Sequence, residues 1–152
     1  MSSETLTVVL QQLTTAPDVA RVREVVRNVA RKLVGSDGVS IVVRYGDRCC
    51  YVEEDAIGPL WKGQQFAMSS CVSGWVMLNA TAAVIPDVYS DPRVPSDVYR
   101  ETFVMSMAMV PVGRQNPLAA IGAYWARRHV ATEEEVEILL ALGDSAALAL
   151  QR

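Results

Sequence analysis

The sequence predicts an α+β domain in which an antiparallel sheet of five or six strands carries the N- and C-terminal helices on one face and loops with short helices on the other. Two pairs of strand-like segments, at 38–55 and 103–127, are each joined by a short turn, which leaves no room for the crossover helices that parallel strands require. Helical periodicity is strongest at the two ends of the chain, over about 4–34 and 132–151. The length of 152 residues suits one such domain.

Two helices are expected before the sheet, over Glu4–Leu13 and Pro17–Val34. In the second, valines and a leucine recur at three- and four-residue spacing, and arginines fill the outward face. Pro17 and Asp18 suit its first turn, and Gly35 suits its end.

The strands form two expected hairpins. The first turns at Tyr45-Gly46-Asp47, and the second joins 103–112 to 118–127 through the sequence GRQNP. A helix can approach a sheet closely only where side chains are short, so small residues in the second hairpin indicate the face that the helices cover. These residues are Ser106, Ala108, Ala119, Gly122 and Ala123.

Short elements fill the middle of the chain. We expect a strand near 64–68, a helix over 69–80 capped by Ser69 or Ser70, and a strand over 82–85 that ends at Pro86. One or two helical turns follow over 96–103, capped by Ser96 or Asp97. The last helix opens with Thr132 and Glu135, a capping-box pair.

The composition is that of a soluble globular protein. A net charge of −3 provides no broad positive field, so no nucleic-acid partner is expected. The N-terminus has an acid where a signal peptide has basic residues, and no apolar run approaches the roughly 20 residues of a membrane span. We therefore expect a cytoplasmic location and no membrane span. The three cysteines form neither a disulfide framework nor a zinc-ligand pattern.

Residues 56–103 must cover the sheet face that the terminal helices leave free. Pro86, Pro92 and Pro95 restrict the backbone, and Asp87 and Asp91 can bond nearby N–H groups in turns. A loop of this kind holds its shape and can serve as the lid or wall of a pocket. Equally, it can simply plug the apolar face with side chains such as Val88, Tyr89 and Val94.

The stretch CVSGWVMLNATAAVIPDVYSDPRVPSDVYRETFVMSMAMVPV, followed by a hairpin and an amphipathic helix, resembles the GAF domain. It is most similar to the GAF sensor modules of bacterial two-component sensor histidine kinases. The likeness runs over about 4–150 and is strongest at 62–125. It implies a single GAF/PAS-like sensory domain over 1–152, with a small-molecule pocket built from connecting loops and short helices.

Six of the ten aromatic residues fall in the middle segment, where ring faces and polar tips suit a small-molecule site. Filling of the core is the alternative for each of them. Cys71 sits at the start of a short helix, where the helix dipole favours a thiolate, although a lone cysteine is more often a small buried apolar residue. The predicted ligand-binding residues are Trp61, Phe66, Cys71, Trp75, Val88, Tyr89, Asp91, Tyr99, Phe103 and Met107.

The cofactor stays unassigned. GAF modules that attach bilins often have a histidine directly after the cysteine, whereas Val72 follows Cys71 here, so a covalent bilin is not expected. The cyclic-nucleotide signature of the family is absent. Free methionine sulfoxide reductases of the same fold have a cysteine before the helix glycine, where this chain has Ser73 before Gly74. Catalytic residues and metal ligands are not expected, and any kinase activity would reside outside this chain.

The resemblance implies a module that binds an unidentified small molecule and relays its occupancy through the terminal helices to a downstream kinase or other output domain. A homodimer formed through those helices is expected. Two alternatives remain open. One is a dimerisation spacer whose pocket is filled by its own side chains, and the other is a thiol redox protein that uses Cys71 with Cys49 or Cys50.

Overall fold

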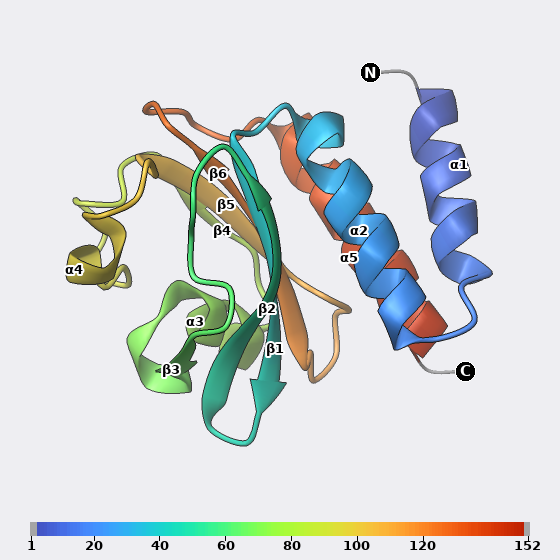
Figure 1. Ribbon diagram of the computed structural model, residues 1–152, viewed down its shortest axis with the longest axis horizontal. Helices are drawn as coiled ribbons and strands as arrows, with labels where there is room; N and C mark the ends of the chain where they lie inside the picture. Colours follow the sequence, from blue (N-terminus) through green and yellow to red (C-terminus); the bar gives the residue numbers. More distant parts are fainter. Residues whose placement is uncertain (1–2, 151–152) are drawn as a thin grey trace.

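A computed structural model describes residues 3–150 and confirms the α+β architecture (Figure 1). Its six strands form one antiparallel sheet in the order β3-β2-β1-β6-β5-β4. Three helices, α1, α2 and α5, lie on one side of this sheet, and the short elements α3 and α4 lie on the other (Figure 1). We call these two sides the helix side and the loop side.

The elements follow the predicted order. The helices are α1 Ser3–Thr14, α2 Val19–Val34, α3 Val72–Asn79, α4 Ser96–Tyr99 and α5 Glu133–Leu150, with a 3-10 turn at Met68–Ser70. The strands are β1 Gly38–Tyr45, β2 Arg48–Ala56, β3 Gln65–Ala67, β4 Ala83–Ile85, β5 Ser106–Pro111 and β6 Ala119–Trp125. Each matches a predicted segment, although the predicted end of the last helix at residue 151 lies outside the described residues.

Strand β1 lies at the centre of the sheet and pairs on both edges. Val42 is opposite Tyr51 of β2 on one edge and Ala120 of β6 on the other. The turn of the first hairpin contains Gly46 at φ 63°, a left-handed conformation that favours glycine. Both predicted hairpins are therefore present, and β6 joins them into one sheet.

A buried apolar cluster fills the space between the helix side of the sheet and the helices. Helices α2 and α5 pack on the sheet directly, and α1 packs on both of them as an outer layer (Figure 1). Helix α5 approaches β5 so closely that a Cβ on Gly143 would lie 2.8 Å from the Pro111 carbonyl oxygen. Helix α5 thus contacts the sheet closely at a position without a side chain.

The predicted caps are partly confirmed. Asp18 is the N-cap of α2 and accepts a hydrogen bond from the Arg21 N–H at 2.8 Å, and Gly35 ends that helix in the left-handed conformation. Thr132 and Glu135 form the reciprocal capping box of α5, at 2.7 and 3.1 Å.

The predicted serine and aspartate caps of the two short helices are wrong. Cys71 is the N-cap of α3 and Pro95 is the N-cap of α4, and neither helix has a side-chain cap bond. Instead, the Ser70 hydroxyl donates to the Ala67 carbonyl within the 3-10 turn. A tight turn before the helix therefore displaces the helix start by a residue or two.

Gly122 corrects one further expectation. Gly122 does not help the helices to pack on the sheet, because a side chain at this position would point to the loop side. An added Cβ would lie there 2.5 Å from the Tyr124 hydroxyl. Ala108 and Ala123 do lie in the helix-side cluster, as predicted. Within residues 3–150, no helix combines the length and apolar character needed to cross a membrane.

Candidate functional site

Four buried rings meet on the loop side of the sheet, and we call them the aromatic cluster: Tyr51, Trp61, Tyr99 and Tyr124. Each comes from a different segment, namely β2, the loop after it, α4 and β6. The Trp61 ring centre lies 4.6 Å from that of Tyr99, 5.4 Å from that of Tyr124 and 5.6 Å from that of Tyr51. These separations are typical of favourable aromatic contacts, so Trp61 is the hub of this core.

The position of Trp61 is fixed from two directions. The Glu54 carboxylate accepts hydrogen bonds from the backbone N–H groups of Leu60 at 3.1 Å and Lys62 at 2.9 Å, the two residues that flank the tryptophan. The indole N–H donates to the Val98 carbonyl in α4 at 3.3 Å. One strand and one short helix therefore hold the loop, and the ring enters the core at a defined angle.

Burial raises the pKa of Tyr51 and of Tyr99 well above the ordinary value, so both phenols remain protonated. The Tyr51 hydroxyl lies 3.2 Å from the Ser73 hydroxyl, and Ser73 lies 3.3 Å from the Cys71 sulfur. A chain of polar groups thus leads from the aromatic cluster to the start of α3.

A cleft of about 230 Å³ opens beside the start of α3, and we call it the Arg93 cleft. The Arg93 guanidinium lies 4.4 Å from the Trp75 ring centre and bonds both carboxylate oxygens of Asp91, at 3.0 and 2.7 Å. Hydrogen bonding to Arg93 lowers the pKa of Asp91, so the pair stays charged. The lining residues are Met68, Ser69, Ser70, Cys71, Trp75, Leu78, Asn79, Pro92, Arg93, Val94 and Pro95.

Cys71 is the most polarised thiol of this site. Hydrogen bonds from the Cys49 thiol, the Ser73 hydroxyl and the backbone N–H groups of Gly74 and Ser73 lower its pKa, although burial opposes them. The same pairing, together with burial, raises the pKa of Cys49. The directions of the two shifts favour ionisation of Cys71, at the N-terminal end of a helix, over ionisation of Cys49. Residues 3–150 contain no cluster of three or more His, Cys, Asp or Glu side chains placed to hold a metal ion.

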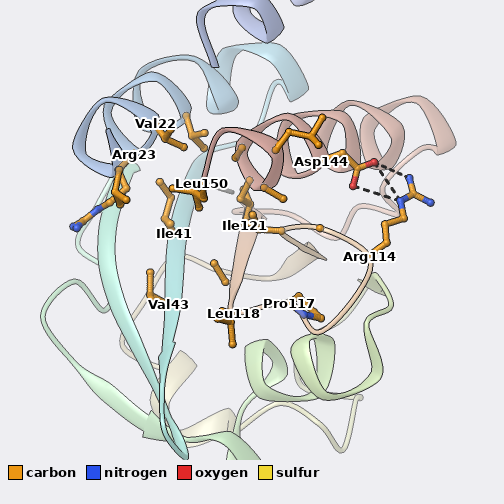
Figure 2. Close-up of a pocket in the computed structure, with 18 of the residues that line it drawn as sticks. Val22, Arg23, Ile41, Val43, Arg114, Pro117, Leu118, Ile121, Asp144 and Leu150 are labelled. Carbon is orange, nitrogen blue, oxygen red and sulfur yellow. Dashed lines mark hydrogen bonds and ion pairs between the residues drawn. The ribbon is translucent and has the colours of Figure 1, made fainter. Parts of the chain in front are cut away.

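A second, larger depression lies on the helix side, between α2, α5 and the end of the sheet, and we call it the helix-side groove (Figure 2). Its volume is about 710 Å³. Val22, Ile41, Val43, Ile121 and Leu150 line it, and at one edge Arg114 pairs with Asp144 at 3.2 Å. The lining is mostly apolar, and its polar residues are Arg23, Arg114, Gln115, Asn116 and Asp144.

The sequence of residues 17–151 matches the GAF domain family. This match covers most of the chain and agrees with the observed sheet order and helix placement. The chain belongs to the GAF domain family. A search of curated proteins found no match to the sequence.

Solved structures with the same fold include proteins of different activities. The GAF domain from an Acinetobacter phosphoenolpyruvate-protein phosphotransferase has a TM-score of 0.83 at 16% identity, over 98% of this chain and 93% of the other. The free methionine-R-sulfoxide reductase from Neisseria meningitidis, in complex with its substrate, scores 0.80 at 17% identity, over 98% and 87%.

The chromophore-binding domain of an unusual bacteriophytochrome from R. palustris scores 0.76 at 15% identity, over 95% of this chain and 59% of the other. At these identities the similarity establishes the fold and does not transfer an activity.

In this GAF domain most of the predicted ligand-binding residues gather on the loop side. Trp61, Val88, Tyr99 and Met107 are buried in its core, and Phe66 and Phe103 pack at the edge of that core. Cys71 and Trp75 line the Arg93 cleft, with Asp91 bonded to Arg93 beside them. Tyr89 is not brought together with the others, because its side chain is 43% exposed on the loop after β4.

Sequence reasoning missed four residues of the site and named Cys49 only as an alternative partner of Cys71. The four residues are Tyr51, Glu54, Arg93 and Tyr124. Alternation along the strands was the available signal for two of them, because Tyr51 and Tyr124 lie on the same face of the sheet as the predicted residues Phe66 and Met107. No sequence signal indicated that Arg93 would cover Trp75.

Proposed function

We propose that this GAF domain is the cytoplasmic sensory module of a bacterial signal-transduction protein, a two-component sensor histidine kinase. In this proposal it binds a small molecule in the Arg93 cleft, performs no catalysis itself, and relays occupancy through its terminal helices to a kinase or other output domain. The observation that carries the proposal is the convergence of a fixed cation, an indole ring and a polarised thiol in one cleft, next to the aromatic cluster.

The chemistry of the cleft favours a small ligand with a polar or anionic group and a flat apolar part. Arg93 offers charge-assisted hydrogen bonds, and Trp75 and Leu78 offer apolar surface. Because the volume is about 230 Å³, the ligand would be of metabolite size. The aromatic cluster behind the cleft is already packed, so the ligand would bind at its edge and not within it.

A route to the terminal helices exists through the sheet. Helix α3 packs on the loop side of β5 and β6, and α5 packs on the helix side of the same two strands. Suppose that α3 can take two positions, each packed against its own arrangement of the sheet and α5. A ligand that binds more tightly when α3 is in one position would increase the population of that arrangement. The signal would therefore cross the sheet by packing and would require no charged relay.

Thermal-shift screening of a metabolite library tests the ligand proposal. A true ligand should raise the Tm of the wild type but not that of Arg93→Ala or Trp75→Ala. Arg100→Ala removes an exposed arginine outside the cleft and should respond like the wild type. The proposal fails if no compound raises the Tm, or if the shifts persist in both cleft variants.

A dimerisation spacer is the second candidate, and the helix-side groove favours it. Leu118, Leu148 and Val19 line this groove and are more than half exposed. Two copies related by a twofold axis would cover these side chains through α2 and α5 of each copy. In this role the packed aromatic cluster would be a filled pocket that serves stability.

Sedimentation velocity across a concentration series tests the dimer. Leu148→Lys should produce a monomer, because it places a charge in the groove. Val130→Lys is the matched control, since Val130 is equally exposed but lies outside the groove. A wild-type protein that stays monomeric at high concentration would exclude this candidate.

A further inference from the structure

The apolar part of the helix-side groove is made of aliphatic side chains. It is lined by Val22 of α2, Ile41 of β1, Ile121 of β6, and Leu148 and Leu150 of α5 (Figure 2). Within the part of the chain that the structure describes, no aromatic side chain lines this groove. The Arg93 cleft, in contrast, has an indole ring in its wall, which suits a flat group. A lining of branched aliphatic side chains suits a flexible alkyl chain instead.

Part of this lining is exposed to solvent although it is apolar. The exposed fraction is 65% for Leu118, 60% for Leu148 and 54% for Val19. Apolar side chains that stay exposed around one depression are typical of a binding surface. The volume of about 710 Å³ is that of a small-molecule site, so a medium-length alkyl chain has room in the groove.

The shape of the groove favours a slender occupant over a second copy of the chain. In a twofold dimer, the same surface of each copy meets its counterpart. Two concave grooves would then face each other and enclose a space larger than either of them, and the side chains around that space would lack packing contacts. An alkyl chain is convex, and it can lie along the lining of one groove.

The polar rim indicates the head group of the ligand. Figure 2 shows Arg23 at one side of the groove and the pair of Arg114 and Asp144 at the other. Arg23 is already held by an acid of β2 at 3.0 Å, and both of these side chains are partly buried. The Arg114–Asp144 pair is more exposed, so it is weak and can rearrange, and Arg114 Nη1 has no partner among the described residues. Because Gln115 and Asn116 add exposed amide groups beside it, this rim suits a carboxylate.

We propose that the helix-side groove binds a free medium-chain fatty acid as a monomer, with its alkyl chain along the aliphatic lining and its carboxylate at Arg114. The site lies across the sheet from the Arg93 cleft, so it does not rest on the small-molecule role proposed for that cleft. The alkyl chain would touch α2, α5 and the two central strands at once. Its burial would therefore stabilise the packing of both helices on this end of the sheet.

Isothermal titration calorimetry with sodium octanoate and sodium decanoate, both monomeric in solution, tests the alkyl part of the site. Decanoate should bind about 15-fold more tightly than octanoate, because each buried CH₂ contributes about fourfold. Ala119→Phe fills the groove with a ring and should abolish binding of both acids. Leu118→Asp places a like charge beside the carboxylate at an exposed position that tolerates it, and it should weaken binding at least about tenfold. Val130→Asp is its matched control, since Val130 is 63% exposed and lies outside the groove.

The head group is tested by comparing decanoate with 1-decanol, which has the same alkyl chain without the charge. Arg114→Gln should weaken binding of decanoate about fivefold and leave that of decanol unchanged. Arg100→Gln removes an arginine whose side chain is equally exposed, 67% against 66%, but which lies outside the groove. It should bind both compounds like the wild type.

Three results would overturn the proposal. The first is a wild type that binds no decanoate, or binding that persists in both Ala119→Phe and Leu118→Asp. The second is loss of decanoate binding in Arg93→Ala, which would place the acid in the Arg93 cleft. The third is a wild-type dimer that Leu118→Asp dissociates and decanoate does not affect, which would assign the groove to a second copy. Binding that fails only in the groove variants supports the proposal whether or not the Arg93 cleft has a ligand of its own.

Discussion

The Arg93 guanidinium lies over the face of the Trp75 ring, 4.4 Å from its centre, while both oxygens of Asp91 hold it in place. This contact joins the loop after β4 to helix α3. It closes one wall of the Arg93 cleft, so the loop that follows Pro86 keeps its shape through a side-chain contact as well as through its prolines.

Replacement of Arg93 by alanine should lower the free energy of unfolding by about 1 kcal/mol, because both the cation–π contact and the bond to Asp91 are lost. Urea denaturation followed by tryptophan fluorescence measures the change. Arg100→Ala removes a pair with Asp97 that is largely exposed, and it should leave stability unchanged. Equal losses in the two variants would show that neither the Trp75 contact nor the Asp91 bond adds measurably to stability.

Gly74→Ala should be among the most damaging single-methyl additions in the chain. A Cβ at this position would overlap the carbonyl group of Met68, which is backbone and cannot move away. We expect a loss of about 2–4 kcal/mol in unfolding free energy.

Gly58→Ala is the control for this substitution. Its added Cβ would meet only the Phe103 ring, at 3.7 Å, which is ordinary contact. Thermal melts of the two variants should therefore separate clearly. A Gly74→Ala protein as stable as Gly58→Ala would mean that the 3-10 turn adjusts freely to α3.

The elements of the fold were predictable because periodicity and turn residues are local. Gly46 and the two strand-like runs around it determine the first hairpin, and Thr132 with Glu135 determines the start of α5. The predicted helix caps were wrong where a tight turn uses the same residues as the start of the helix, as at Ser70. Such competition depends on packing that a short window of sequence does not contain.

The sequence was enough to predict which segment forms the site, but it was not enough to predict which residues contact one another there. The clustering of aromatics in 56–103 led to Trp61 and Tyr99, which do meet. The contacts of Ser73 with Cys71 and Tyr51 depend on where the 3-10 turn places α3 relative to β2, and the position of Arg93 depends on a proline-rich loop. Both are consequences of tertiary packing between segments far apart in sequence.

Acid should weaken the start of α5 through Glu135. The hydrogen bonds from the Thr132 N–H and from His129 lower the pKa of Glu135, against the opposing effect of burial. Because the folded-state pKa is below that of the unfolded chain, the resulting stability is fully present above the unfolded value and is lost as pH falls through the folded value.

The measurement is the unfolding free energy of the wild type and of Glu135→Gln between neutral pH and about pH 3, the acid range in which carboxylates titrate. The variant should be less stable at neutral pH and should lose less on acidification. Glu133→Gln removes a charge from the same turn without touching the capping box, and it should keep the wild-type slope. Parallel curves for wild type and Glu135→Gln would contradict the assignment.

Ser40 and Tyr124 form a buried pair that can be tested as a unit. Their hydroxyls are hydrogen-bonded at 2.5 Å between β1 and β6, and the tyrosine side chain lies over Gly122. Ser40→Ala leaves the tyrosine hydroxyl buried without its partner, and Tyr124→Phe leaves the serine hydroxyl in the same state. Each should cost about 1–3 kcal/mol of unfolding free energy.

The double variant should cost less than the sum of the two single variants, because removing both partners leaves no orphaned polar group. A coupling of about 1 kcal/mol is expected from a double-mutant cycle in urea. Strict additivity would show that the two hydroxyls do not depend on each other. Tyr124 also contacts Trp61 in the aromatic cluster. If no coupling is measured, the Ser40 hydrogen bond does not stabilise this cluster, and ring packing alone does.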